Sequence, residues 1–447
     1  MKEKFLKAMQ DKDFSELFKK GGISFLMRIG GQIMGFVITF IIAYYFGAKG
    51  LGDYVLAIIV LRVFTLIAKL GIDTASIRFI ASYATKGQWS LVKEYRKKII
   101  ILLTFSTLFC SCLMYYFSQE IAETIGANPE YIRLNAFFVL PMAFFMLNYQ
   151  SLRGMKKIAE YSFFYWMSRT FFSAIIILIA VQFSEHPNIP IYAFLLGLVF
   201  SSILSYLVFR KKLNYKLQVH KLVKTVDRIK ELVSMKAIIL VSLPLMLAQS
   251  GQFVIAWTDK LMLGGMATSY DVGVYDVAFK LSMFVNIALS SVTSISAPKF
   301  AEMYEKKDFV RLENIVNQAT KLIFWTSLPL LLLFFFFSVD ILRLFGPDFE
   351  SGLKVFYFLC FARGVSAFTG PAGNLLQMTG RHVIFMNVLF AGAIVNIALN
   401  YLLIPLYGIE GAAISSMSSI IFWNLAMVYF VKKEFGFLTI YIPFFKR

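Results

Sequence analysis

The stretch that decides the fold is residues 53–83, DYVLAIIVLRVFTLIAKLGIDTASIRFIASY. It is apolar enough to be a membrane-spanning helix, yet it contains Arg62 and Lys69, seven residues apart and away from both ends. An ionised side chain near the bilayer centre costs roughly 2.5 to 3.5 kcal/mol on insertion scales, so it persists where it faces a wet cavity or a counter-charge. Several other apolar stretches also carry charges, most of them positive.

The composition indicates a membrane protein. Hydrophobic residues make up 58% of the chain, charged residues 16%, and the mean hydropathy is +0.69, which excludes a soluble globular domain. Twelve apolar stretches are long enough to cross a hydrocarbon core of about 30 Å, and in lipid such stretches must be helices. They cover residues 22–46, 53–83, 98–118, 131–152, 161–183, 191–209, 237–265, 271–297, 318–338, 353–377, 382–404 and 411–432. We therefore expect an all-α polytopic membrane protein.

The net charge of +19 resembles that of a nucleic-acid-binding protein, but its distribution predicts a different partner. Of the 45 Lys and Arg, 33 fall on the tails and loops of one side, counted from a cytoplasmic N-terminus, and only four on the other. Because cytoplasmic loops of membrane proteins are enriched in Lys and Arg, both termini are expected in the cytoplasm. The sequence thus predicts a multi-pass protein of the cytoplasmic (inner) membrane that contacts membrane lipids and binds no nucleic acid.

A weak internal repeat predicts two halves. A shift of 221 residues aligns residues 51–57 with 272–278 and residues 78–83 with 299–304, which maps the second span onto the eighth. Two lobes of six helices are then related by a pseudo-twofold axis along the membrane normal, with the natural cavity between the lobes. The expected divisions are an N-terminal cytoplasmic segment 1–21, an N-lobe 22–209, a basic amphipathic linker 210–236, a C-lobe 237–432 and a cytoplasmic tail 433–447.

The charges within the spans allow two interpretations. Lys69 with Asp73 and Asp276 with Lys280 are spaced four residues apart and can pair on one helix, so that charge pairing merely locks the bundle. Alternatively, the excess of cations marks a hydrated cavity that attracts an anion, and the planar guanidinium of arginine grips phosphate oxygens in pairs. The candidates for binding an anionic substrate in a cationic cavity are Arg28, Arg62, Lys69, Arg169, Lys280 and Arg363, while Lys260 is a further cation of the seventh span.

The sequence contains no motif for catalysis or metal binding. The three cysteines, Cys110, Cys112 and Cys360, fall inside spans in no metal-ligand arrangement, and the histidines lie at or beyond span ends. We therefore expect no catalytic residue, no metal site and no cofactor. The acids Asp73, Asp259 and Asp276 could carry a coupling H⁺ or Na⁺, or could simply neutralise a lysine.

Three segments of the second half carry a resemblance to a known family. They are residues 273–281 (GVYDVAFKL), residues 370–381 (GPAGNLLQMTGR) and residues 396–416 (NIALNYLLIPLYGIEGAAISS). The last segment ends a span at Pro405, turns at Gly408 and opens the next span with a small packing face. The chain resembles the polysaccharide transporter branch of the multidrug/oligosaccharidyl-lipid/polysaccharide exporter superfamily.

This resemblance implies a Wzx-type flippase that moves a lipid-linked oligosaccharide, such as an O-antigen or capsule repeat unit, across the membrane by alternating access. The carrier implied is a polyprenyl diphosphate, whose anionic group suits a cationic cavity. A monomer that works beside a polysaccharide polymerase and glycosyltransferases is the expected form.

Two alternatives belong to other classes. A cation-coupled drug or metabolite antiporter of the same superfamily should carry an acid in its first lobe to bind its ion and cationic cargo, whereas the first span offers Arg28. A membrane glycosyltransferase or ligase usually has a large outer loop, and the longest outer connections here, 119–130 and 339–352, are too short for a catalytic domain. The sequence therefore favours a transporter that is not an enzyme.

Overall fold

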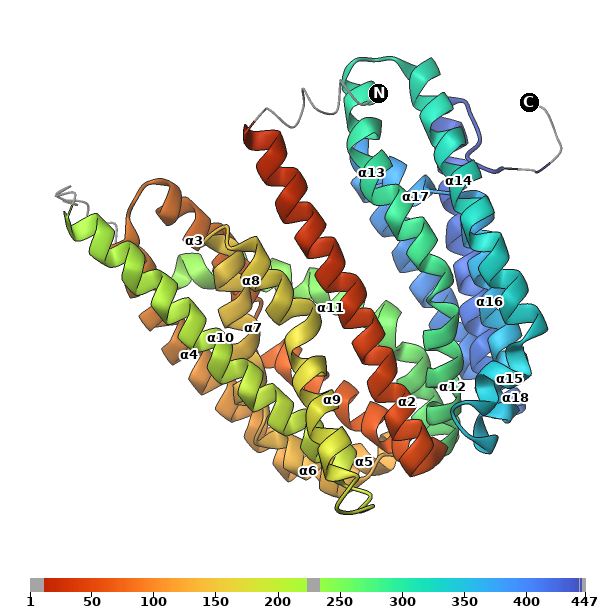
Figure 1. Cartoon of the computed structure of the whole chain (residues 1–447), viewed down its shortest axis with the longest axis horizontal. Helices are drawn as coiled ribbons and strands as arrows, with labels where there is room; N and C mark the ends of the chain where they lie inside the picture. The colour runs from red at the N-terminus through yellow and green to blue at the C-terminus, as the bar shows by residue number, and fades with distance from the viewer. Residues whose placement is uncertain (1–11, 223–233, 442, 444–447) are drawn as a thin grey trace. The chain divides into compact units, whose positions relative to one another are not determined.

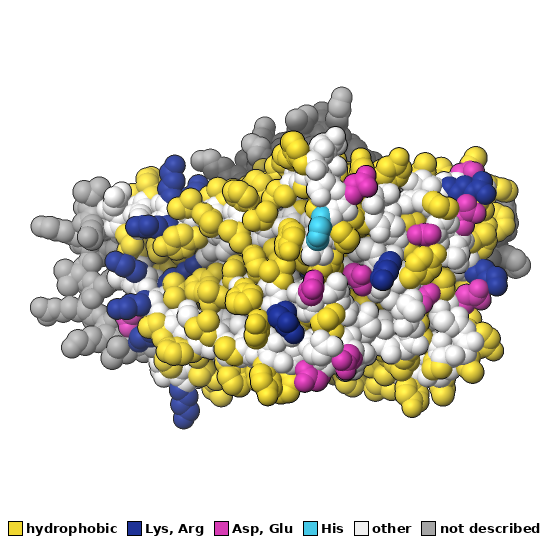
Figure 2. Space-filling model, turned by 90° about the horizontal axis from the view of Figure 1, so that it is seen from below, with side chains coloured by type: hydrophobic (Ala, Val, Ile, Leu, Met, Phe, Trp, Pro, Cys, Tyr) yellow, Lys and Arg dark blue, Asp and Glu magenta, His cyan; other side chains and the backbone are white. Residues whose placement is uncertain are grey.

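The chain is built from helices throughout the part that can be described. The computed structural model describes residues 12–222, 234–441 and 443, and every regular element in these residues is a helix (Figure 1). On the face drawn in Figure 2, hydrophobic side chains lie among Lys, Arg, Asp and Glu. The predicted fold class, an all-α polytopic membrane protein, is confirmed.

The number of spans agrees with the twelve apolar stretches of the sequence. Six described helices are long and apolar enough to cross a membrane, and four bent helix pairs bring the number to ten. Two of the six, α2 and α18, each merge two helices at a glycine with non-helical backbone angles, Gly47 and Gly408. Counting these two as pairs gives twelve spans, and the predicted turn at Gly408 is present with φ 55° and ψ −128°.

The helices form two compact units that alternate along parts of the chain. Unit 1 comprises residues 1–46, 57–123 and 127–252, and unit 2 comprises residues 47–56, 124–126 and 253–447. Two short segments of the first half, 47–56 and 124–126, therefore pack with the second. The boundaries expected from the sequence, with a single cut at a linker, stay a prediction.

Unit 1 contains most of α2 and the helices that follow it up to the first part of α11. Their bounds are α2 Lys12–Ala68, α3 Ile72–Thr85, α4 Trp89–Tyr116, α5 Ser118–Ile125, α6 Pro129–Ala136, α7 Val139–Gly154, α8 Ile158–Ser162, the π-helix η1 Phe163–Ser168, α9 Arg169–Ala180, α10 Ile189–Leu222 and α11 Met235–Met266. The expected linker helix over residues 221–235 falls largely on 223–233, outside the described residues, as does much of the segment 1–21.

Unit 2 contains the second part of α11 and the remaining helices. Their bounds are α12 Ser269–Ser282, α13 Val285–Glu305, α14 Phe309–Phe336, α15 Ser338–Arg343, the 3₁₀-helix η2 Pro347–Gly352, α16 Leu353–Thr369, α17 Ala372–Met378 and α18 His382–Phe435. One core cluster joins α13, α14, α17 and α18 through side chains such as Phe300, Leu312, Leu375 and Val431.

The second span is broken where the sequence suggested one continuous helix over 53–83. Helix α2 ends at Ala68 and α3 begins at Ile72, because Leu70 and Gly71 have positive φ angles of 50° and 73°. A Cβ atom on Gly71 would lie 2.2 Å from the carbonyl oxygen of Ser242 on α11. Glycine therefore allows both the left-handed turn and the close approach of α11 within unit 1.

Candidate functional site

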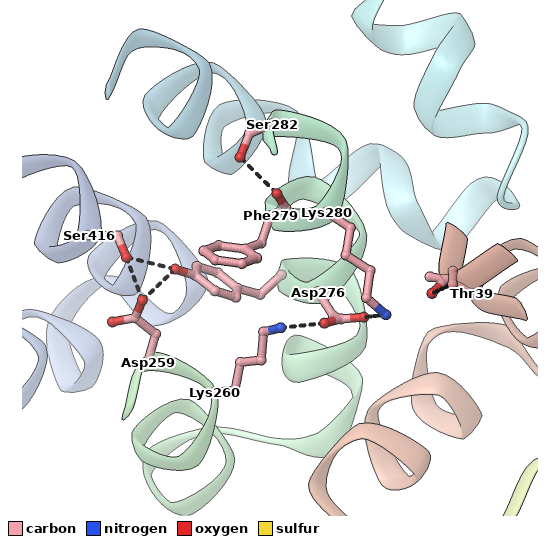
Figure 3. A network of polar contacts seen from close by, with 10 residues as sticks. Thr39, Asp259, Lys260, Asp276, Phe279, Lys280, Ser282 and Ser416 are labelled. Atoms are coloured by element: carbon pink, nitrogen blue, oxygen red, sulfur yellow. Dashed lines mark hydrogen bonds and ion pairs between the residues drawn. The ribbon is translucent and has the colours of Figure 1, made fainter. Parts of the chain in front are cut away.

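The carboxylate of Asp259 is the centre of a polar cluster in unit 2. Its Oδ1 accepts hydrogen bonds from the side-chain amides of Asn396 (2.8 Å) and Asn400 (2.7 Å). Its Oδ2 accepts from the hydroxyl of Tyr275 (3.0 Å) and from the hydroxyl of Ser416 (Figure 3). Four neutral donors thus solvate one partly buried carboxylate inside a helix bundle, which offsets the cost of taking its charge out of water.

Helix α18 supplies three of these partners because it folds back on itself at Gly408. Asn396 and Asn400 lie one turn apart on its first part and so face the same way. Beyond the turn, a Cβ on Gly411 would lie 2.2 Å from the carbonyl oxygen of Leu403, so glycine is needed for the two parts to approach and present Ser416.

One acceptor in this cluster is unused. The side-chain oxygen of Asn400 is buried and has no hydrogen-bond partner among the described residues, although its amide nitrogen donates to both Asp259 and Asn396. Because an unsatisfied buried acceptor is costly, it points to a group that this oxygen could bind. The cluster contains carboxylate, amide and hydroxyl oxygens, which are the ligands that hard cations prefer.

A second cluster is formed by the residues that follow Asp259 on α11 and Tyr275 on α12. Asp276 accepts from Lys260 on α11 (2.5 Å) and pairs with Lys280 on α12 (2.6 Å), as Figure 3 shows. The side chains of Asp276 and Lys260 are 1% and 4% exposed, whereas that of Lys280 is 34% exposed. The Asp276–Lys280 pair expected from the spacing is present, but the spacing did not reveal Lys260.

Arg363 of α16 is a buried cation close to these groups. It is 7% exposed, it makes no ion pair with a described residue, and its Nε has no hydrogen-bond partner there. Its guanidinium lies 5.6 Å from the ring centroid of Phe279, which Lys260 approaches to 4.7 Å. Aromatic faces partly compensate these two charges, but less than a carboxylate would.

In unit 1, Lys69 and Asp73 form the expected pair at 2.8 Å across the break between α2 and α3. The sequence did not reveal that Gln249 of α11 accepts a hydrogen bond from Lys69 and donates one to Thr74 at 2.9 Å. With Asp73 opposite it, Lys69 is largely neutralised.

The remaining candidate arginines are half-buried in unit 1. Arg28 lies 5.2 Å from the ring centroid of Trp166, and Arg169 lies 5.3 Å from that of Phe194. Arg62 lies in the second part of α2. The structure therefore groups the candidates into a Lys69–Asp73 pair, the Lys260–Asp276–Lys280 trio next to Arg363 and Asp259, and the three half-buried arginines of unit 1.

Comparison with known proteins assigns the family. The family model for polysaccharide biosynthesis proteins matches residues 17–304, so the chain belongs to that family. The MatE family model matches residues 244–402.

The matched relatives include an uncharacterised membrane protein and two proteins described as flippases. The first, from Methanocaldococcus jannaschii, is 23% identical over 85% of this chain and 76% of its own length. A probable flippase, AglR, of Haloferax volcanii is 25% identical over 39% of this chain and 37% of its own length. A probable low-salt glycan biosynthesis flippase, Agl15, of the same organism is 22% identical over 38% of this chain and 36% of its own length.

Two solved structures share the fold. An inward-facing multidrug resistance transporter of the MATE family, from the MOP superfamily, has a TM-score of 0.71 with 15% identity, covering 91% of this chain and 94% of its own. The lipid II flippase MurJ in an inward closed conformation has a TM-score of 0.69 with 15% identity, covering 92% of this chain and 88% of its own. The chain thus belongs to the polysaccharide biosynthesis protein family and has the fold of these two transporters.

Proposed function

We propose that this chain moves a polyprenyl-diphosphate-linked oligosaccharide from the inner to the outer leaflet of the cytoplasmic membrane by alternating access, without catalysing a reaction. Both termini lie in the cytoplasm, and the protein acts as a monomer beside a polymerase and glycosyltransferases. The family and the flippases among its relatives support the transport of a lipid-linked glycan.

The observation that carries the proposal is the uncompensated positive charge in the bundle. Arg363 is buried without an ion pair among the described residues, and its Nε has no hydrogen-bond partner there. Keeping such charges in a membrane is costly, so an anionic substrate is the natural counter-charge. Arginine suits a diphosphate because its fork makes paired hydrogen bonds to phosphate oxygens. We assign this role to Arg363, with Arg28, Arg62, Arg169 and Lys280 as further candidates. Lys69, the sixth candidate from the sequence, is already paired with Asp73.

The coupling ion proposed is Na⁺ at Asp259, rather than an ion at Asp73 or Asp276, because each of the latter already faces a lysine. A half-turn of the Asn396 or Asn400 side-chain amide would replace its N–H donor by an oxygen that can bind a cation. Together with the carboxylate and the hydroxyl of Ser416, these oxygens would surround a small hard cation.

The test of the proposed function is a sidedness assay. Purified protein is reconstituted in liposomes with a fluorescent polyprenyl-diphosphate disaccharide, and an impermeant quencher reports how fast the inner pool reaches the outer leaflet. We expect exchange far above that of protein-free liposomes. Exchange equal to that of protein-free liposomes, with and without a Na⁺ gradient, would contradict the proposal.

A further inference from the structure

An apolar groove runs between α14 and α16 in unit 2. Its volume is about 800 Å³, within the range of cavities that enclose a small molecule. Every residue that lines it is aliphatic, aromatic, glycine, methionine or cysteine, and none is charged. It does not coincide with either polar cluster described above.

The groove follows the two helices along their length. Phe335 and Tyr357 mark one end with ring centroids 5.7 Å apart, and Phe324 and Phe368 mark the other at 6.5 Å. The markers are eleven residue positions apart on each helix, which corresponds to about 17 Å of helix. At the Phe324 end the ring of Tyr441 lies 5.5 Å away, and its backbone N–H donates to the carbonyl of Phe368. The shape fits a chain better than a compact ligand.

Small residues give the groove its width. Gly364 and Ala367 of α16 lie along it, and a Cβ on Gly364 would only reach ordinary contact, 3.6 Å from a methyl of Leu331. On the outer rim, the side chains of Phe335 and Phe361 are 61% and 62% exposed, so the groove opens toward the side of the helices that meets lipid.

The floor of the groove adjoins the polar clusters. Cys360 lines it and lies one turn from Arg363 on α16, within electrostatic reach of the guanidinium. Met417 also lines it and follows Ser416, which binds Asp259. The groove therefore adjoins, through Cys360, the helix turn that carries a buried cation whose Nε has no hydrogen-bond partner among the described residues.

We propose that this groove holds the isoprenoid chain of the translocated lipid while Arg363 binds its diphosphate. The inference rests on the proposed function and adds to it a site for the hydrocarbon part of the substrate. A single lipid with an apolar chain and an anionic group would account for an uncharged groove beside a buried cation on the same helix, α16.

The depth of Arg363 favours this occupant over a bilayer phospholipid. Arg363 is ten residues from the start of α16, which places it about 15 Å along the helix, near the middle of a hydrocarbon core of about 30 Å. A resident phospholipid keeps its headgroup at the membrane surface, whereas a lipid that is being moved across presents its anionic group at this depth.

The test is photo-crosslinking in liposomes with a polyprenyl diphosphate that carries a diazirine in the middle of its chain. We expect the label on the peptides that contain residues 324–335 and 357–368. Gly364→Phe fills the groove and should reduce this labelling at least tenfold, whereas Gly364→Ala, which adds one methyl group in an uncrowded place, should keep it. Phe361→Ala removes a rim ring without adding atoms and should weaken labelling if Gly364→Phe misfolds.

Competition identifies the occupant. Excess unlabelled polyprenyl diphosphate should displace the probe, and excess phosphatidylglycerol should not. Labelling that is equal in wild type, Gly364→Phe and Phe361→Ala, or that phosphatidylglycerol displaces equally well, overturns the inference. Labelling of these peptides in a protein that shows no exchange in the sidedness assay would contradict the proposed function while leaving the chain-binding groove in place.

Discussion

Asp259 of α11 and Tyr275 of α12 are joined by a 3.0 Å hydrogen bond. The next residue of each helix, Lys260 and Asp276, forms an ion pair at 2.5 Å. Residues 259 and 260 of α11 therefore contact residues 275 and 276 of α12. The proposed cation site at Asp259 is thus one peptide bond away from the Lys260–Asp276–Lys280 trio. A cation that draws Asp259 toward it would act on the same two helix segments that position Lys280.

Asp259→Asn should remove the response of the protein to Na⁺. The substitution keeps the shape but removes the charge that a cation needs, so we expect Na⁺ to raise the melting temperature of the wild type and not that of the variant. The measurement is thermal unfolding in detergent with Na⁺ or choline. Asp340→Asn, an exposed acid at the start of α15, is the control and should respond like the wild type. An equal Na⁺ response in Asp259→Asn would exclude this site.

Asp276→Asn should destabilise the protein strongly. It leaves the buried Lys260 without its counter-charge, and breaking a buried pair by removing one partner typically costs about 3–5 kcal/mol. Glu302→Gln, at an exposed pair with Lys306, should leave thermal unfolding unchanged. The double variant Lys260→Met, Asp276→Asn should recover part of the loss, since no charge is then stranded. If the single and double variants unfold alike, the buried pair does not contribute as described.

Gly71→Ala should be far more harmful than Gly35→Ala. Gly71 has φ 73°, and a Cβ there would lie 2.2 Å from the carbonyl oxygen of Ser242, whereas nothing lies within 4 Å of a Cβ on Gly35. The left-handed backbone alone costs an L-residue roughly 1–2 kcal/mol, and the clash adds to it. Thermal unfolding of the two variants in detergent measures the difference. Similar melting temperatures would mean that the break between α2 and α3 does not need glycine.

Contacts within one helix were predictable from the sequence, and contacts between helices were not. The spacing of four residues identifies the pairs Lys69–Asp73 and Asp276–Lys280. The partners Gln249 and Lys260 come from α11, and finding them requires the packing of that helix. Asn396 and Asn400 lie in the segment that most resembled a known family, and their shared helical face was a usable signal for a polar site.

The break between α2 and α3 at Leu70 and Gly71 was harder to predict from the sequence than the pairs within one helix. A glycine inside an apolar stretch is tolerated by a continuous helix, so the sequence alone did not separate a span from a broken one. What decides it is the backbone of α11 at Ser242, which occupies the space that a side chain on residue 71 would need.

The central claim is that a buried arginine binds the anionic group of the translocated lipid, and Arg363→Gln tests it most directly. Because Arg363 makes no ion pair with a described residue, removing its charge should leave the melting temperature unchanged or higher. In the sidedness assay we expect at least a tenfold slower exchange of the polyprenyl-diphosphate disaccharide. The matched control Arg343→Gln, at an exposed arginine paired with Glu350, should exchange at the wild-type rate. Wild-type exchange in Arg363→Gln would contradict the claim.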